Sequence, residues 1–263
     1  MPYPQRIVCL TEETTEALYL MGEQDRIVGI SGFTVRPPRA RKEKPKVSAF
    51  TSAKIDKIMA LQPDLVLGFS DLQADIAADL VRLGIEVHLF NQRSVSEILR
   101  MINVLAGMIG KPEKGDRLVA DLQKNIENIT IETSKLKNKP KVFFEEWDEP
   151  LISGIRWVSE LIEIAGGEDC FPELASESLA KNRIIADPSS VIERQPDIII
   201  GSWCGKKFQP ARVAARPGWE AIPAVQTGSL YEVKSPIILQ PGPAALLDGV
   251  DKLAEIIGQW DRR

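Results

Sequence analysis

Two stretches of the chain, roughly half its length apart, share one order of polar and apolar positions. Each has a short amphipathic segment ending in Gln-Pro-Asp, then an unbroken apolar run, a glycine and an aromatic residue. The first copy covers residues 56–69 and the second covers residues 189–203. Proline disfavours helical backbone in the residue before it, so the helices are expected to stop at Gln62 and Gln195. An apolar run without alternation is typical of a strand buried on both faces.

The residues that follow the two apolar runs are expected at a ligand-binding edge. Gly68 and Gly201 end the predicted strands, which places Phe69 and Trp203 just beyond the carboxyl ends. In an open parallel sheet, ligands bind at that edge. The duplicated unit therefore predicts two similar α/β lobes that face each other across a cleft.

The rest of the chain extends this pattern. Strands and helices alternate up to residue 91 and again after residue 139, as in parallel sheets. Between them the apolar positions keep helical spacing, and a segment of about 25 residues that opens at Pro112 would form a helix nearly 40 Å long. The predicted fold is α/β, with two Rossmann-like lobes, each with a parallel central sheet, joined by one long α-helix. The predicted domains are residues 1–110, a connecting helix at 111–138, and residues 139–263.

Composition narrows the class of partner. The apolar content of 44%, the charged content of 27% and the net charge of −4 are those of an ordinary globular protein. They give no reason to expect a nucleic-acid partner. No apolar run reaches the length of about 18 residues that a membrane span needs, so no membrane insertion is expected.

Cysteine usage and the first residues bear on the compartment. Cys9, Cys170 and Cys204 are odd in number and widely separated, which favours free thiols. The chain passes directly into a strand with no signal peptide ahead of it. We therefore expect a cytoplasmic protein as the sequence stands, or a periplasmic one if a leader has been removed.

Several short stretches together resemble a known family. They are Arg6-Ile-Val followed by Thr15-Glu16, Val28–Ser31, Pro37-Pro38, Ile58–Val66, Leu83–Ile85, Gly166-Gly167 and Pro196-Asp197. In this order they resemble the helix-hinged (class III) substrate-binding proteins of ABC importers for vitamin B12 and ferric siderophores, most of all the vitamin B12 (cobalamin) binders. The resemblance implies two Rossmann-like lobes, a connecting helix, a ligand held between the lobes and no catalysis.

In the amino-terminal lobe, the loops after the strands carry the candidate ligand-binding residues. These are Glu12, Glu13, Phe33, Arg36, Phe50, Phe69 and Asp71. The three phenylalanines fall where the resemblance places aromatics against a flat corrin, and aromatic faces suit a large rigid ligand. Each phenylalanine could instead fill the local core. The acids could instead stabilise a helix start, where carboxylates are favoured.

The carboxyl-terminal lobe offers a second set. It comprises Glu146, Trp147, Arg183 and Trp203, with the acidic run Glu145–Glu149 expected as a loop after the first strand. Each tryptophan could line the site or the core. If the acidic loops of both lobes face inward, the cleft would be negative and would repel anionic ferric siderophores. It would suit a cationic or neutral ligand, or one with amide donors, as corrinoids have.

The predicted function is that of a non-enzymatic, monomeric binding protein for a corrinoid or similar large chelate. No covalent cofactor and no metal site are expected, and the single histidine, His88, makes a catalytic Ser/His or Cys/His pair implausible. Asp56 matches one of the two acids with which the family docks its permease, but the other falls near the uncharged Ser189, which leaves an ABC permease partner open. The alternatives are a ferric-siderophore or haem carrier, and a cytoplasmic corrinoid sensor or storage module without a transporter.

Overall fold

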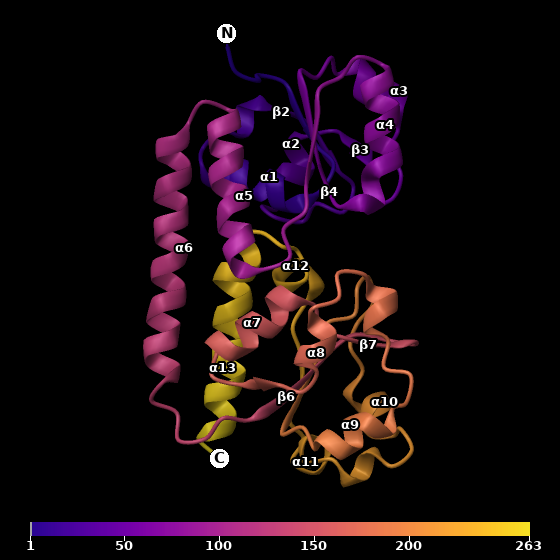
Figure 1. Ribbon diagram of the computed structural model, residues 1–263, viewed down its shortest axis with the longest axis vertical. Helices are drawn as coiled ribbons and strands as arrows, with labels where there is room; N and C mark the ends of the chain where they lie inside the picture. The colour runs from indigo at the N-terminus through magenta and orange to yellow at the C-terminus, as the bar shows by residue number, and fades with distance from the viewer. Residues whose placement is uncertain (1) are drawn as a thin grey trace. The chain divides into compact units, whose positions relative to one another are not determined.

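The computed structural model describes residues 2–263, which form two compact units (Figure 1). Unit 1 comprises residues 2–92, 96–122 and 241–244, and unit 2 comprises residues 93–95, 123–240 and 245–263. Each unit has its own largely parallel sheet with helices. The predicted fold class, α/β with two parallel-sheet lobes, is confirmed.

The sheet of unit 1 has five parallel strands in the order β3-β2-β1-β4-β5. The strands are β1 (Ile7–Cys9), β2 (Ile27–Ser31), β3 (Lys46–Ser48), β4 (Leu65–Phe69) and β5 (Val87–Phe90). The helices are α1 (Glu12–Leu20), α2 (Ala40–Glu43), α3 (Ile55–Ala60), α4 (Ala74–Arg82) and α5 (Val95–Met108), with 3-10 turns η1 (Gln24–Arg26) and η2 (Asp71–Gln73).

Helices cover the central strands of this sheet on both faces. Val8 and Val66 pack with Ile58 of α3 and Leu80 of α4. Successive side chains of a strand point to opposite faces, so the equally buried Leu65 faces the other way. Burial on both sides explains why the sequence of β4 shows no alternation.

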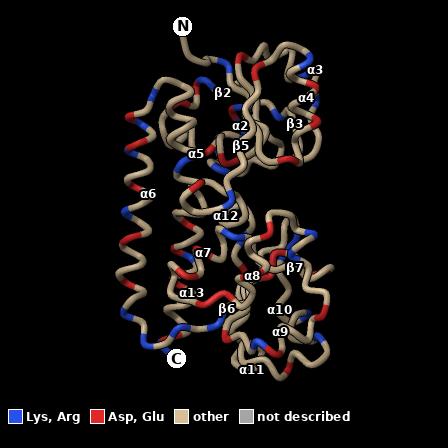
Figure 2. The backbone as a smooth tube through the Cα atoms, in the orientation of Figure 1, with Lys and Arg blue, Asp and Glu red and all other residues tan. Residues whose placement is uncertain are grey.

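The predicted long helix exists as α6 (Pro112–Thr133), with 22 residues. Basic and acidic residues are spread along the length of α6 (Figure 2). Its residues Val119, Leu122 and Ile129 form a buried apolar stripe. The division into units falls inside α6, between Leu122 and Gln123.

The sheet of unit 2 has the order β10-β9-β6-β7, and β8 also pairs with β6. The strands are β6 (Lys141–Asp148), β7 (Leu151–Ser153), β8 (Glu168–Asp169), β9 (Ile198–Gly201) and β10 (Leu230–Glu232). The helices are α7 (Arg156–Ile164), α8 (Pro172–Ala175), α9 (Ser189–Arg194), α10 (Pro210–Ala214), α11 (Pro223–Gln226), α12 (Ser235–Ile238) and α13 (Val250–Asp261), with 3-10 turns η3 (Ala180–Arg183) and η4 (Trp219–Ala221) and π-helix η5 (Ala245–Gly249).

One strand of unit 2 runs further than expected. The acidic run Glu145–Glu149, expected as a loop, continues β6 to Asp148 and turns into β7, its antiparallel partner. Hydrogen bonding to β7 keeps this run extended, and strand pairing of this kind has no local signal in the sequence. The acids therefore lie on a hairpin whose geometry the sheet determines.

The repeated Gln-Pro-Asp has a scaffold role in both units. Gln62 and Gln195 have left-handed backbone, with φ of 46° and 49°, so each helix ends there. The Asp64 carboxylate accepts the N–H groups of Gln5 and Arg6 at 2.7 and 2.8 Å. Asp197 accepts the N–H of Lys141 at 2.9 Å. Each aspartate thus ties the start of one central strand to its neighbour.

Asp64→Ala is expected to lower the free energy of unfolding of unit 1 by about 1–2 kcal/mol, because two backbone N–H groups lose their acceptor. Hydrogen exchange of the β1 and β4 amides would measure it. Asp75→Ala, which removes an exposed acid of α4, is the control. Equal protection in the two variants would contradict the proposed role of the motif.

Candidate functional site

Two of the three predicted phenylalanines are accessible at the strand ends of unit 1. Phe33 follows β2 and is 57% exposed, and Phe50 follows β3 and is half-buried. The N–H of Gly32 donates to the carbonyl of Ser48 at 2.7 Å, so these two loops adjoin. Phe69, at the end of β4, is only 5% exposed. Of the three predicted phenylalanines, Phe33 and Phe50 are therefore the two that a ligand could reach.

A buried glutamine holds these loops together. Gln73 Oε1 accepts the N–H of Phe69 at 2.9 Å, and Gln73 Nε2 donates to the carbonyl of Phe50 at 2.8 Å. A Cβ at Gly68 would lie 2.6 Å from Oε1, so this glycine leaves room for the amide. Sequence reasoning missed Gln73 of η2, because no spacing in the sequence shows that its amide bonds to the backbone of two different loops.

The acids of unit 1 lie at a helix start and are buried. Glu12 and Glu13 open α1, and burial raises the pKa of Glu12 above its ordinary value. Glu13 accepts a hydrogen bond from the Thr11 hydroxyl at 2.8 Å. This placement matches the alternative in which carboxylates stabilise the positive end of a helix.

The other charged residues predicted in unit 1 differ in setting. Arg36 Nε donates to Glu16 Oε1 at 2.8 Å, and Glu16 Oε2 also accepts the N–H of Ala244 at 3.0 Å. Arg36 is thus committed to an internal ion pair. Asp71, at the start of η2, is exposed.

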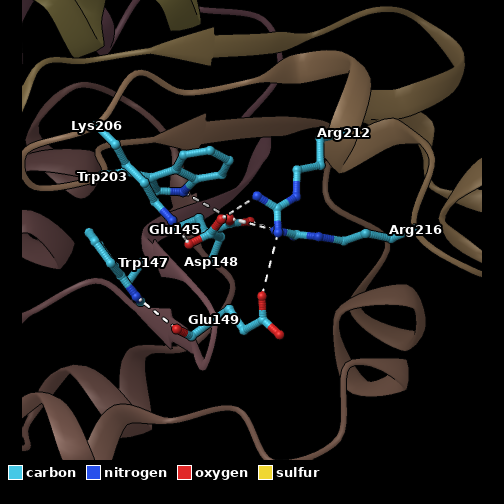
Figure 3. Close-up of polar contacts among 8 residues, drawn as sticks. All are labelled: Glu145, Trp147, Asp148, Glu149, Trp203, Lys206, Arg212 and Arg216. Carbon is cyan, nitrogen blue, oxygen red and sulfur yellow. Dashed lines mark hydrogen bonds and ion pairs between the residues drawn. The ribbon is translucent and has the colours of Figure 1, made fainter.

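In unit 2, a buried carboxylate organises the strand ends. Glu145 is fully buried in β6 and accepts two hydrogen bonds from Arg216, at 2.7 and 2.8 Å (Figure 3). Trp203 Nε1 donates to Glu145 at 2.9 Å. Both oxygens accept from groups that can only donate, an arrangement that favours the ionised carboxylate. Burial nevertheless raises its pKa above the ordinary value, although Arg216 and Trp203 act in the opposite direction.

A second carboxylate lies beside the first. The Asp148 side chain is 2% exposed and forms an ion pair with Lys206, while Arg212 lies 3.5 Å from its other oxygen (Figure 3). Burial, the largest single effect, raises the pKa of Asp148, but the hydrogen bond and charge of Lys206, a backbone hydrogen bond and the charge of Arg212 together outweigh it and hold the pKa of this carboxyl below its ordinary value. Arg212 also lies 3.4 Å from Glu149.

The tryptophans flank the Lys206 ammonium. Lys206 Nζ lies 4.2 Å from the ring centre of Trp147 and 5.0 Å from that of Trp203. Trp203 is buried and packs edge-on against Phe208, whereas Trp147 is half-buried. Of the two predicted tryptophans, Trp147 is therefore the more accessible.

Arg183 lies inside unit 2. Its guanidinium is 2% exposed, donates to both oxygens of Glu146 at 2.7 and 3.1 Å, and also donates to the carbonyl of Ser153. Arg183 thus orients Glu146 from within.

The acidic run of unit 2 is neutralised by basic residues. Glu145, Glu146, Asp148 and Glu149 all pair with arginine or lysine. A negative cleft was expected only if the acidic loops face inward, and in unit 2 these carboxylates are paired with cations. The charge argument against anionic ligands therefore does not apply to this unit. The partners Lys206 and Arg216 lie 58 and 71 residues from the carboxylates that they bind, a separation at which no sequence spacing identifies a pair.

The docking acid of unit 1 is exposed. Asp56 lies in the first turn of α3, and its role in docking stays a prediction. In unit 2 the corresponding helix α9 begins at Ser189, whose N–H and hydroxyl donate to Asp187 at 2.9 and 2.7 Å. A carboxylate thus stands two residues before the uncharged position.

Residues 2–263 contain no group of three or more His, Cys, Asp and Glu side chains that could hold a metal ion. His88 is partly buried and packs edge-on against Phe90, with ring centres 4.3 Å apart. Over the same residues, none of the helices combines the length and the apolar character that crossing a membrane requires.

The comparison with family models decides the class of this protein. Residues 7–237 match the model of the family described as periplasmic binding protein. The chain belongs to the periplasmic binding protein family. It is a substrate-binding protein of the ABC-importer type, and the family consists of transport proteins that are not enzymes.

Among curated relatives, an uncharacterized ABC transporter substrate-binding lipoprotein of Bacillus subtilis is 27% identical, over 97% of this chain and 80% of its own. A vitamin B12-binding protein of Vibrio campbellii is 29% identical, over 75% of this chain and 70% of its own. Both alignments cover most of the relative.

Solved structures share the fold. A possible iron-binding protein of Staphylococcus epidermidis has a TM-score of 0.83, at 22% identity and over 97% of this chain and 98% of its own. The vitamin B12 binding protein of Vibrio cholerae has a TM-score of 0.78 at 22% identity, and the match covers 99% of each chain. A haem-binding protein of Roseiflexus has a TM-score of 0.80 at 22% identity, and the match covers 96% of this chain and 99% of its own.

Proposed function

We propose that this periplasmic binding protein binds a corrinoid, or a similar large chelate, and delivers it to an ABC permease. The observation that carries the proposal is Phe33, which is 57% exposed at a strand end, on a loop that adjoins the one bearing Phe50. Relatives named as vitamin B12-binding proteins support the ligand class. Large aromatic side chains bury a rigid ligand face at little cost in conformational entropy.

In unit 2 we assign direct contact to Trp147 and supporting roles to two buried residues, Trp203 and Arg183. Trp147 is half-buried at the end of β6. Trp203 and Arg183 are almost fully buried, and Arg183 fixes Glu146. These groups would hold the hairpin that presents Trp147 in one conformation.

Phe33→Ala and Phe50→Ala are each expected to weaken cyanocobalamin binding by about tenfold, the loss that follows from about 1.4 kcal/mol of aromatic contact. Calorimetric titration of wild type and both variants would measure it. Val81→Ala, which shortens an exposed apolar side chain of α4, is the control and should bind as wild type does. Equal, negligible heat for all four proteins would remove the corrinoid proposal.

One observation favours a second candidate, a haem or ferric-siderophore carrier. Lys206 and Arg212 are partly exposed above buried Asp148, and such cations would attract carboxylate or catecholate oxygens. Ultraviolet-visible spectra of protein purified from its native host would separate the candidates, because corrinoid, haem and ferric chelate absorb differently. A haem or ferric-chelate spectrum would replace the corrinoid proposal by this one.

A further inference from the structure

Lys206 of unit 2 is held in the way that proteins hold an organic cation. Its ammonium pairs with Asp148 and lies over the rings of Trp147 and Trp203, at 4.2 and 5.0 Å from their centres (Figure 3). Indole rings attract cations through the negative charge of their faces, most strongly when water is displaced. A carboxylate together with two indole faces is a complete set of partners for one ammonium group.

The walls of this arrangement are fixed independently of Lys206. Trp147 Nε1 donates to the carbonyl of Glu149 at 2.8 Å. Trp203 Nε1 donates to the buried Glu145, and its ring packs edge-on against Phe208 at 5.1 Å. The two rings would therefore keep their places if the lysine left, and Asp148 stands on β6, where it is paired with Leu151 of β7. We call the two rings and Asp148 the cation box.

Lys206 itself is carried on a less constrained segment. The turn of residues 204–207 is exposed, Gly205 within it has φ of +77°, and the lysine side chain is 36% exposed. The box, in contrast, stands on β6 and just beyond the end of β9. Movement of this turn would withdraw the lysine and leave the box open.

The carboxylate has capacity that Lys206 does not use. Lys206 bonds to Asp148 Oδ1, whereas the buried Oδ2 has no hydrogen-bond partner among residues 2–263 and only the ion-pair contact with Arg212 at 3.5 Å. An ammonium group has three N–H donors. A free alkylammonium could therefore bond to both oxygens, which the tethered lysine does not do.

We propose that Trp147, Trp203 and Asp148 form a binding site for an alkylammonium group, and that Lys206 occupies it until a ligand amine displaces it. This rests on the proposed function for the presence of a ligand at the strand ends. Because the side chains of corrinoids are amides, it favours, within that function, a large chelate that carries a primary amine. Lys206 acts as a tethered competitor. A short tether gives an effective concentration in the millimolar range. Its removal strengthens amine binding by one plus the ratio of that concentration to the intrinsic Kd, which is about tenfold for an intrinsic Kd of about 0.1 mM.

The test uses n-butylammonium, which reproduces the lysine side chain, titrated into the full-length protein while NMR follows the indole N–H signals. Lys206→Ala should bind it with a Kd about tenfold lower than wild type. Lys207→Ala removes the adjacent exposed lysine and should bind as wild type does. Lys206→Ala/Asp148→Asn should lose the gain. Equal binding by the Lys206→Ala and Lys207→Ala variants, or no effect of Asp148→Asn, would overturn the proposal.

Two further arms keep the test decisive. Arg212 could move into the vacated box, so Lys206→Ala/Arg212→Gln is titrated as well, and absence of binding in both variants rejects the site. Should Lys206→Ala fail to fold, Lys206→Gln takes its place.

Cyanocobalamin titrated into the same wild-type sample separates the two proposals. Corrinoid binding without amine binding rejects only the cation box, and amine binding without corrinoid binding rejects only the corrinoid.

Discussion

Arg216→Met is expected to destabilise unit 2 by about 3–5 kcal/mol, because it leaves the buried charge of Glu145 without its cation. The methionine keeps much of the apolar stem, so the change tests charge more than volume. Arg216 supplies both oxygens of this fully buried carboxylate with hydrogen bonds of 2.7 and 2.8 Å. Among residues 2–263, the indole N–H of Trp203 would remain as a hydrogen-bond donor to Glu145.

The loss of stability caused by Arg216→Met should become smaller as the pH falls. Burial already raises the pKa of Glu145 above its ordinary value of 4.5, and Arg216 limits that rise. Without Arg216 the pKa of folded Glu145 rises further, so the folded variant binds a proton more readily than the unfolded chain. Stability of the variant is then lost as pH increases through this raised pKa and regained as pH falls towards 4.5. The difference from wild type is therefore larger at pH 8 than at pH 5.

Tryptophan fluorescence during urea unfolding isolates this effect. All five tryptophans, at positions 147, 157, 203, 219 and 260, belong to unit 2. Lys252→Met breaks an exposed ion pair with Glu255 in α13 of unit 2 and serves as the control, with an expected change below about 1 kcal/mol. A loss in Arg216→Met no larger than in this control, or one independent of pH, would show that the pair contributes little.

Gly201→Ala is expected to cost about 3–5 kcal/mol, as much as removing a core phenylalanine. A Cβ at this last residue of β9 would lie 1.8 Å from the ring of Phe208. Phe208 is buried against Trp203, and β9 is fixed between β6 and β10. The ring would have to leave its site, because the central strand cannot move.

A double variant identifies the cause. Phe208→Ala removes the clashing ring, so adding Gly201→Ala to it should cost little more. Gly154→Ala is the control within unit 2, since its Cβ would meet its nearest neighbour, Phe144, at an ordinary 3.4 Å. Tryptophan fluorescence again gives the free energies of unfolding. Full additivity of the Gly201 and Phe208 substitutions would mean that the glycine matters for another reason.

The fold could be predicted because its signals are local. Each Gln-Pro-Asp ends a helix at a left-handed glutamine, and the apolar run after it is a strand covered on both faces. The expected helix at Pro112 is α6. The hairpin from β6 to β7 was missed, because strand pairing depends on a partner and not on the composition of the acidic run itself.

The candidate site could be predicted only in part. Phe33 and Phe50 are accessible at the strand ends, as expected. Arg183, in contrast, is buried and forms an ion pair with Glu146. The sequence also did not predict that Lys206 would pair with Asp148 and lie over two tryptophan rings. Such pairs form between segments 37 and 58 residues apart, and many basic residues could have served equally well on sequence grounds.

The sequence by itself determined the duplicated α/β architecture and the residues that stand where strands end. Helix stops, buried strands and glycine positions are decided by steric and hydrophobic constraints acting within a dozen residues. Only the tertiary structure decided the charge of the unit 2 surface. There, Arg183, Lys206, Arg212 and Arg216 neutralise the acidic run, because a carboxylate that loses its water on folding needs a cation from whichever segment packs against it.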